Sequence, residues 1–388
     1  MPDDKHAVIV WLNEHAAEMV SLLEVLVNSD SSSRDKAAVD ATGDILKAFF
    51  AKHDIPIETF PDATYGEAIR AYVEVAGSNQ RPVMLLGHRD TVFPPGEARR
   101  RPFRIEDGRA YGPGVADMKA GLVMNVFVLA AFKACNCAPA PLMALITSDE
   151  EIASPFSRAV IEQQARLARL VLNSEPGRAS GNVVSGRKGG AFIRFEVFGK
   201  AAHSGANFSD GRSAIGEMAH KIVALHAMTD LDRGTTVNVG LVSGGQTVNT
   251  TAPHAVGEID IRTMTTTDRQ AALDQVAAIM AQSTVPDTHA TWEILGEFLP
   301  LEGSAKSNQL LDLYLGVSAE QGVHIAGEFT GGCADSGYTA AQGIPTLCGL
   351  GPVGGKAHTV EEYMEVATML PRAQAMAMTI LRLDGAGL

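Results

Sequence analysis

Apolar and polar positions show two kinds of spacing along the first half of this chain. Short apolar runs bounded by turn residues predict strands, and apolar residues spaced three or four positions apart predict helices. Strands are predicted at 71–75, 83–86, 142–147 and 170–172, and helices at 38–52, 119–133 and 157–168. Because strands and helices alternate, the pattern predicts an α/β domain with a mostly parallel sheet.

A different order of elements runs from 187 to 298. Its predicted strands and helices follow the order βαββαβ, at 192–198, 212–228, 235–242, 257–264, 268–281 and 291–295. This order is the signature of a ferredoxin-like domain. Residues 299–388 return to mixed structure and end on a predicted helical stretch at 361–383. The simplest architecture is a small domain, 187–298, inserted between the two parts, 1–186 and 299–388, of a larger one.

The start of the chain predicts an amphipathic helix. Apolar residues recur there at helical spacing, at Val8, Leu12, Ala16, Met19 and Leu23. Charged residues interrupt every apolar run and no small-residue cleavage site follows, so neither a signal peptide nor a membrane span is expected. The cysteines are too few and too irregularly placed for a disulfide framework, namely Cys135, Cys137, Cys333 and Cys348. A cytoplasmic protein with reduced thiols is therefore expected.

Composition narrows the classes of partner. With 388 residues, 46% of them hydrophobic and 20% charged, the chain is an ordinary globular protein large enough for two domains. Its net charge of −13 disfavours nucleic acid and anionic membranes as partners. The acidity does not exclude an anionic substrate, because a site can be locally positive on an acidic protein.

Chemistry-bearing residues follow the predicted strands. His88, Glu150 and Glu175 each come just after one, and in parallel sheets ligands bind at the carboxyl ends of strands. One nitrogen of His88 can bind a metal while Asp90 accepts a hydrogen bond from the other. Taken alone, the same pair is also compatible with a strand-end histidine and a capping aspartate.

Two acidic motifs and one further histidine add to this pattern. Asp117 lies in a glycine-rich loop that opens an apolar helix, where it is either an N-cap or a metal ligand; the loop does not match the Walker or dinucleotide patterns. Glu150 and Glu151 follow an apolar strand, where adjacent carboxylates are costly unless cations neutralise them. Such neighbours can divide their roles, one binding metal and the other acting on a water. His358 follows a second glycine-rich turn.

Together, two histidines and three carboxylates match nitrogen and oxygen ligation of zinc. The charges of two Zn²⁺ ions would balance those of three carboxylates and one hydroxide.

These motifs, in this order and over essentially the whole chain, resemble the metal motifs of the aminoacylase/glutamate carboxypeptidase family of dizinc peptidases. The motifs are residues 88–92, 112–119, 149–151, 175–176 and 357–358. The segments at 102–104 and 110–114 are similar in particular to the bacterial glutamate carboxypeptidases. The resemblance implies that Asp117 bridges two zinc ions, that Glu150 is the general base and that Asp90 orients His88. The remaining ligands would be His88 and Glu175 for one ion, and Glu151 and His358 for the other.

The resemblance also assigns residues to the inserted domain, as a lid and dimer interface. His203 resembles the histidine that stabilises the tetrahedral intermediate, often across a dimer. Asn249 and Arg262 resemble the residues that hold the substrate carboxylate; without the resemblance they would be a turn asparagine and a surface strand arginine. Residues 331–336 resemble a glycine-rich turn near the substrate, in which Cys333 replaces a smaller residue, and no role is inferred for its thiol.

The expected function is zinc-dependent hydrolysis of an amide bond next to a free carboxylate. A carboxypeptidase that releases a C-terminal amino acid, of glutamate type, is the first interpretation, and an N-acyl amino acid amidohydrolase or a dipeptidase is the alternative. The expected cofactors are two Zn²⁺ ions, with Co²⁺ or Mn²⁺ as possible replacements, and the expected assembly is a homodimer. From another class, the alternative is a catalytically silent metal-binding protein, which the presence of Glu150 disfavours.

Overall fold

A computed structural model describes residues 2–388, with side chains from Ala7 onward, as two compact units. Unit 1 combines the chain up to Gly186 with Gly303–Thr330 and Ala334–Leu388. Unit 2 combines Arg187–Glu302 with Gly331–Cys333. Unit 2 therefore extends a few residues beyond the segment 187–298 expected from the pattern, and it includes the turn that carries Cys333.

Unit 1 is built on a six-stranded sheet with the order β1-β2-β6-β3-β7-β14. Its strands are β1 Ile57–Phe60, β2 Ala68–Val73, β3 Val83–His88, β6 Leu142–Thr147, β7 Leu170–Asn173 and β14 Thr346–Leu347. Strands β6, β3, β7 and β14 pair in parallel, whereas β2 joins β6 and β1 in antiparallel pairs. The mostly parallel α/β class is confirmed.

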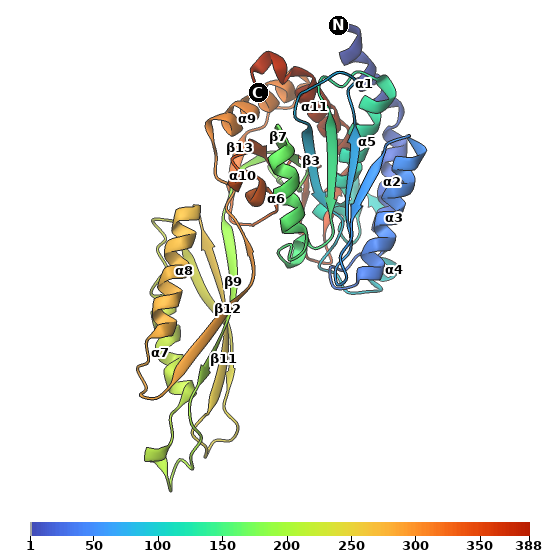
Figure 1. Cartoon of the computed structure of the whole chain (residues 1–388). Coiled ribbons are helices and arrows are strands. Elements are labelled where there is room, and N and C mark those ends of the chain that lie inside the picture. The colour runs from blue at the N-terminus through green and yellow to red at the C-terminus, as the bar shows by residue number, and fades with distance from the viewer. Residues whose placement is uncertain (1) are drawn as a thin grey trace. The chain divides into compact units, whose positions relative to one another are not determined.

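Helices cover both faces of this sheet (Figure 1), with α6 and α10 packed together on one side and α1, α5 and α11 on the other. They are α1 Pro2–Glu14, α2 Ala16–Val27, α3 Lys36–Lys52, α4 Glu97–Arg100, α5 Ala120–Cys135, α6 Ser157–Leu167, α9 Ala305–Glu320, α10 Ser336–Ala341 and α11 Met369–Arg382. One segment, Val115–Cys135, is apolar and long enough to cross a membrane, but 94% of its apolar window is buried. Its hydrophobicity is accounted for by packing inside unit 1.

Shorter strands complete unit 1. They form a four-stranded sheet and a two-stranded ribbon, from β4 Arg104–Glu106, β5 Arg109–Tyr111, β8 Val183–Arg187, β13 Gly327–Thr330, β15 Gly354–Gly355 and β16 Tyr363–Glu365. Strand β16 corrects the helix predicted at 361–383. Met364 pairs with Ala110 of β5, and the helix begins only at Met369. This pairing joins segments far apart in sequence, so local periodicity could not reveal it.

The predicted opening helix is divided in two at His15. Val8, Leu12, Met19 and Leu23 are buried as the spacing predicts, but α1 ends at Glu14 and α2 starts at Ala16. The imidazole of His15 stacks on Trp11 with ring centroids 3.8 Å apart, and its Nδ1 lies 2.7 Å from the Trp11 carbonyl oxygen. The helix is interrupted where His15 makes this local contact with Trp11. The spacing of hydrophobic residues cannot predict such a contact.

Unit 2 has the predicted βαββαβ order. Its elements are β9 Gly189–Phe198, α7 Ala214–His226, β10 Thr236–Gly244, β11 His254–Thr263, α8 Thr266–Ala281 and β12 His289–Phe298. The antiparallel sheet has the order β10-β11-β9-β12, which is ferredoxin-like, and both helices cover one of its faces (Figure 1). Alternate residues of β9 and β11 point into that helix-covered core, among them Ile193, Phe195 and Ile259.

Candidate metal centre

The bridging role expected of Asp117 depends on where its two carboxylate oxygens point. Its Oδ1 lies 3.3 Å from Nε2 of His88, and its Oδ2 lies 3.4 Å from Nε2 of His358. Asp117 is not the N-cap of α5, which starts at Ala120 after a turn at Val115–Lys119. The peptide bond Asp117–Met118 is cis. Each oxygen of one carboxylate therefore faces a different histidine.

The other candidate ligands divide between the two histidines. Glu175 Oε1 lies 3.6 Å from Nε2 of His88, and Glu151 Oε2 lies 3.0 Å from Nε2 of His358. Glu150 lies on the His88 side, with its Oε2 3.8 Å from the same Nε2. By proximity alone the ligand atoms also form two groups of three that share His88, one with Asp117 and Glu151 and one with Glu150 and Glu175. The nitrogen–oxygen distances to the two histidines separate a His88 side, with Glu175, from a His358 side, with Glu151.

These spacings fit a pair of metal ions. Ligand atoms about 2.0–2.2 Å from a tetrahedral zinc ion lie roughly 3.3–3.6 Å from one another. The distances from His88 to Asp117 and Glu175, 3.3 and 3.6 Å, fall in this range, and so does the 3.4 Å between His358 and Asp117. The 3.0 Å between His358 and Glu151 is slightly shorter. The residue types and their spacing are thus suited to two divalent cations that share Asp117.

Local structure explains how these ligands meet. All six residues of β3 are buried, and the strand carries His88 to its carboxyl end. Glu175 follows β7, the parallel neighbour of β3. The helix α5 passes very close to the turn before Glu175, because a Cβ on Gly121 would lie 1.9 Å from the Ser174 carbonyl oxygen. Only glycine permits this approach, which keeps the Asp117 loop beside Glu175.

Asp90 connects the two halves of the cluster through backbone groups. Nδ1 of His88 lies 3.1 Å from the Asp90 carbonyl oxygen and 3.4 Å from the Asp90 carboxylate. The same carboxylate accepts hydrogen bonds from the backbone N–H groups of Glu150 and Glu151, at 3.2 and 3.1 Å, and from the hydroxyl of Ser33 at 2.7 Å. Asp90 therefore touches His88 and also fixes the backbone of the two glutamates.

Burial perturbs the ionisation of the whole cluster. It raises the pKa of Glu150 well above the ordinary value, with Glu175 adding to the effect and His88 opposing it. Burial also raises the pKa of Glu151 to about 7. Hydrogen bonds to Asp117 and Glu151 raise the pKa of His358 to about 10. Burial opposes ionisation of Asp117 as well, but hydrogen bonds from both histidines hold its pKa below the usual range. Crowded buried carboxylates of this kind mark functional sites.

Sequence reasoning overlooked Asp335 in the glycine-rich turn 331–336. The carboxylate is 2% exposed and accepts hydrogen bonds from the hydroxyls of Ser154 and Thr147, at 2.5 and 3.2 Å. Burial raises its pKa to about 7, and its charge acts on Glu150. In the sequence, Asp335 is visible only as an aspartate two residues after Cys333. Nothing in the local pattern distinguishes a buried aspartate of the site from an ordinary helix cap there.

The residues expected to contact substrate all lie in unit 2. His203 and Asn249 are close together there, because the backbone N–H of Ser204 donates to the Asn249 carbonyl at 3.0 Å and His203 forms an isolated bridge with Thr250. Arg262 lies elsewhere, near the opposite end of β11 from the turn that carries Asn249. The structure thus brings two of these three residues together and separates the third.

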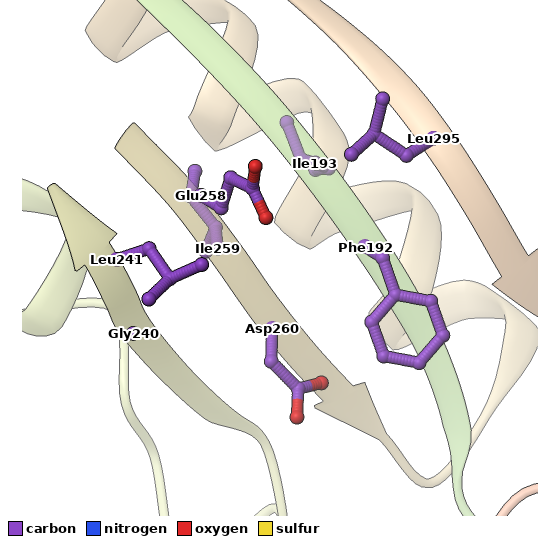
Figure 2. A pocket seen from close by; sticks show the side chains of 8 residues that line it. All are labelled: Phe192, Ile193, Gly240, Leu241, Glu258, Ile259, Asp260 and Leu295. Atoms are coloured by element: carbon purple, nitrogen blue, oxygen red, sulfur yellow. The ribbon is translucent and has the colours of Figure 1, made fainter. Parts of the chain in front are cut away.

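Arg262 has partners within unit 2. Its Nε and Nη2 donate to the two oxygens of Asp260, at 2.7 and 3.2 Å, and its Nη1 donates to the Cys333 sulfur at 2.7 Å. A pocket of about 180 Å³ has Phe192, Asp260 and Leu295 among its lining residues, and Figure 2 shows their side chains. The guanidinium also lies 5.2 Å from the centroid of the Phe192 ring. Cys333, to which no role was given, therefore contacts a candidate substrate-binding residue.

Known proteins are similar to this chain in sequence and in fold. Residues 84–382 match the family described as "Peptidase family M20/M25/M40". The chain is 27% identical to "Carboxypeptidase G2" of Pseudomonas sp. (strain RS-16), over 95% of this chain and 90% of that protein. It is also 27% identical to "Succinyl-diaminopimelate desuccinylase" of Paracidovorax citrulli, over 79% of this chain and 82% of that protein. Among solved structures, the metallo-carboxypeptidase Sso-CP2 of Sulfolobus solfataricus shares the fold, with a TM-score of 0.74, 17% identity and coverage of 94% and 98%.

Proposed function

Because the chain belongs to peptidase family M20/M25/M40 and is a metal-dependent hydrolase, we propose that it is a dizinc carboxypeptidase. It hydrolyses the amide bond next to a free carboxylate and releases a C-terminal amino acid, with glutamate as the first candidate. One observation carries this proposal: the two oxygens of Asp117 face His88 and His358, at 3.3 and 3.4 Å. A carboxylate between two such histidines is suited to bridge two cations.

The ligands of the two cations follow from the distances. His88 and Glu175 would hold one ion, Glu151 and His358 the other, and Asp117 both. When bound, the two ions would act as Lewis acids: they polarise the substrate carbonyl, and they lower the pKa of a water so that hydroxide is available at neutral pH.

Glu150 is the proposed general base. Its carboxylate is buried on the His88 side of the cluster, and Asp90 holds its backbone N–H. It accepts a proton from the attacking water and passes that proton to the nitrogen of the leaving amino acid. Such a role needs a fixed carboxylate beside the ligands, and Asp90 and the burial of Glu150 supply that position.

His203 is the proposed stabiliser of the developing oxyanion. It is exposed, and its Nδ1 accepts hydrogen bonds from the backbone N–H groups of Gly205 and Ala206, both at 3.1 Å. With Nδ1 an acceptor, the neutral imidazole carries its proton on Nε2. Nε2 is then an N–H donor suited to an oxyanion, a contact that contributes about 3–4 kcal/mol in known cases.

Arg262 and Asn249 are the proposed carboxylate-binding residues. Among the described residues, the Arg262 hydrogen bonds to Asp260 and Cys333 use three of its five N–H donors. Two donors remain, enough for a charge-assisted bidentate contact with one carboxylate. Asp260 and Cys333 would hold the guanidinium in a single orientation for this contact.

The layout of unit 2 supports sharing of the site between two copies. Arg262 and His254 are at opposite ends of β11, roughly 27 Å apart at the usual rise per residue, and Asn249 lies beyond His254. A scissile amide and its neighbouring carboxylate are only a few bonds apart. One copy of unit 2 therefore cannot bring both His203 and Arg262 to the same substrate. We place His203 and Asn249 in one subunit of a homodimer and Arg262 in the other.

Other activities of the same chemistry are the nearest alternatives. Relatives carry the names of a carboxypeptidase, a deacetylase and a desuccinylase, so this chain is alternatively an N-acyl amino acid amidohydrolase or a dipeptidase. All of them require the free carboxylate that Arg262 and Asn249 would bind. A silent metal-binding protein would bind the ions and turn over none of the substrates.

A substrate panel with zinc-loaded protein tests the proposal. N-acyl glutamate, N-acyl glutamine and N-acyl alanine vary the leaving amino acid, and the α-methyl ester of N-acyl glutamate removes only the carboxylate next to the amide. We expect fastest hydrolysis of the glutamate compound and at least about 10-fold slower hydrolysis of the ester, because a lost ionic hydrogen bond costs about 1.5–3 kcal/mol. Equal rates for acid and ester would refute carboxylate recognition, and no hydrolysis of any compound would favour the silent protein.

Complementation tests the shared site. We expect His203→Ala and Glu150→Gln to be nearly inactive when each is incubated alone. When the two variants exchange subunits, one site of each hybrid dimer has Glu150 from one chain and His203 from the other, so activity should return. Exchange without recovered activity, or an active monomer, would refute sharing and leave the zinc chemistry standing.

A further inference from the structure

The backbone of the Asp117 loop is bound to a buried carboxylate, that of Glu362. Oε1 of Glu362 accepts hydrogen bonds from the N–H groups of Ala116 and Asp117, at 2.9 and 3.0 Å. Oε2 of Glu362 accepts a third from the N–H of Gly114, at 3.0 Å. Glu362 is 1% exposed, so these bonds are made out of contact with solvent.

Asp117 needs such support because its loop is irregular. Its φ and ψ of −110° and 95° are not helical, although it lies within the turn Val115–Lys119. The N–H groups of that turn cannot all find partners in a regular ladder, and buried N–H groups without an acceptor are destabilising. Clustered N–H groups bind an anion well, and the carboxylate of Glu362 supplies that anion from within the chain.

Glu362 also belongs to the same loop as a candidate ligand. His358 lies four residues before it, and its Nε2 faces Asp117 Oδ2 at 3.4 Å. One short segment thus contacts Asp117 twice, through an imidazole at the carboxylate and through a glutamate at the backbone. The buried Lys119 Nζ donates to the Ser29 carbonyl oxygen at 2.9 Å, and Glu362 acts on its charge. The loop therefore has a buried cation and a buried carboxylate close enough to interact electrostatically, and each is hydrogen-bonded to backbone groups.

We propose that Glu362 is a positioning residue for the metal centre. It sets the orientation of the Asp117 carboxylate so that one oxygen is presented to each metal ion. This inference rests on the proposed two-metal function. Glu362 does not act as a ligand, because both of its oxygens are directed at backbone N–H groups. Since Asp117 would serve both ions, loss of Glu362 should weaken both sites together, whereas loss of His358 should weaken one.

The test compares Glu362→Gln with Glu361→Gln. The first substitution keeps the size of the side chain but replaces one acceptor oxygen with an NH₂ group, so at least one loop N–H loses its acceptor. The second is the matched control, because it removes the same charge at the neighbouring position, where Glu361 is exposed and paired with Lys356. Zinc affinity is measured by competition with a chromophoric chelator on metal-free protein, and the melting temperature of that metal-free protein is recorded in parallel.

We expect Glu362→Gln to bind both zinc equivalents about 10–100-fold more weakly, the usual effect of removing an outer-shell partner, while Glu361→Gln matches the wild type. A lowered melting temperature with unchanged zinc affinity would reduce Glu362 to a structural role and overturn the proposal. Loss of only one equivalent would identify it as a ligand of one ion and overturn it too. If Glu362→Gln does not fold, Glu362→Asp takes its place; it keeps the charge but is too short to reach all three N–H groups, so wild-type affinity would contradict the proposal.

The wild type separates this inference from the function on which it rests. Binding of two zinc equivalents by the wild type, with equal affinity in Glu362→Gln, would refute the role of Glu362 alone. Binding of fewer than two equivalents by the wild type would refute the two-metal centre itself, and the role of Glu362 with it.

Discussion

Unit 1 and unit 2 each bury a group of charged side chains, and the two groups are built differently. In unit 2, Glu217 and Lys221 of α7 are 1% and 2% exposed, with Lys221 Nζ 3.1 Å from Glu217 Oε1. Lys221 also donates to the carbonyl oxygens of Ile279 and Gln282, at 2.9 and 2.7 Å. The N–H groups of Thr284 and Val285 donate to Glu217. Each charge in this pair has an opposite charge and backbone partners.

The group in unit 1 is not balanced in this way. Six carboxylates are gathered near two histidines: Asp90, Asp117, Glu150, Glu151, Glu175 and Asp335. Negative charge exceeds positive charge there even with both imidazoles protonated. A buried ion pair whose charges are both satisfied within the chain, as in α7, needs no added ion, and removing one partner is costly. An excess of buried carboxylates favours a bound cation and is typical of a functional site. The comparison predicts that removing a charge from the group in unit 1 lowers activity but not stability, whereas removing one from the pair in unit 2 lowers stability but not zinc content.

The largest effect is expected for Glu150→Gln in unit 1. We expect kcat to fall by about 10²–10⁴-fold, the scale of general base catalysis, with zinc content retained. Stability should be unchanged or slightly higher without metal, because one repelling buried carboxylate is gone. Steady-state kinetics, metal analysis and thermal melting of the metal-free protein check this. Glu151→Gln, the neighbouring matched change, should instead lose zinc, and near-normal turnover of Glu150→Gln would contradict the assigned role.

Lys221→Met in unit 2 should lower the stability of unit 2 and leave the zinc content unchanged. It leaves the buried Glu217 without its cation, and breaking such a pair costs about 3 kcal/mol or more. We expect this loss as a lower opening free energy in hydrogen exchange of α7 and α8, with exchange in the β3–β6 region of unit 1 unchanged. Zinc content should stay at the wild-type value. An unaltered exchange rate in α7 would show that the pair contributes nothing, and the contrast between the units would be lost.

Arg262→Ala tests a charge that unit 2 would offer to substrate. We expect KM for N-acyl glutamate to rise about 10–100-fold, since ionic hydrogen bonds contribute about 1.5–3 kcal/mol, with zinc still bound. Arg194→Ala is the control, because Arg194 is another partly exposed arginine of the same sheet and pairs with Glu196 at 2.9 Å. An equal KM for both variants would remove Arg262 from the binding site.

The smallest effect concerns pH. Burial opposes ionisation of Glu217, but hydrogen bonds from Val285 and Lys221 outweigh it, so the pKa of Glu217 is lowered in the folded chain. A lowered pKa stabilises the fold above the unfolded pKa, and this contribution disappears as pH falls through the folded value. Opening free energies of α7 should therefore decrease as the pH falls below about 4.5, the ordinary value for glutamate. Glu217→Gln should show a shallower decrease, and an identical slope in both proteins would contradict the assignment.

The sequence by itself predicted much of the architecture and the candidate ligands. Hydrophobic periodicity predicted the elements of unit 2 and many of those of unit 1, because burial of one face repeats locally along a helix or strand. The positions of His88, Glu150 and Glu175 after strands predicted that they would meet, since parallel strands end at one edge of a sheet. The gathering of these residues around Asp117 follows from the same rule together with the glycine-rich turn.

Tertiary structure decided what depends on distant contacts. The hydrogen bonds of Glu362 to the Asp117 loop join residues about 245 positions apart, and β16 is a strand because it pairs with β5 and β15. Asp335 had no local signature, and its burial appears only in the folded chain. The separation of Arg262 from His203 depends on the register of β11 in its sheet. Local patterns specify which face of a segment is buried, but which segments meet, and how far apart two side chains lie, is decided by packing across the whole fold.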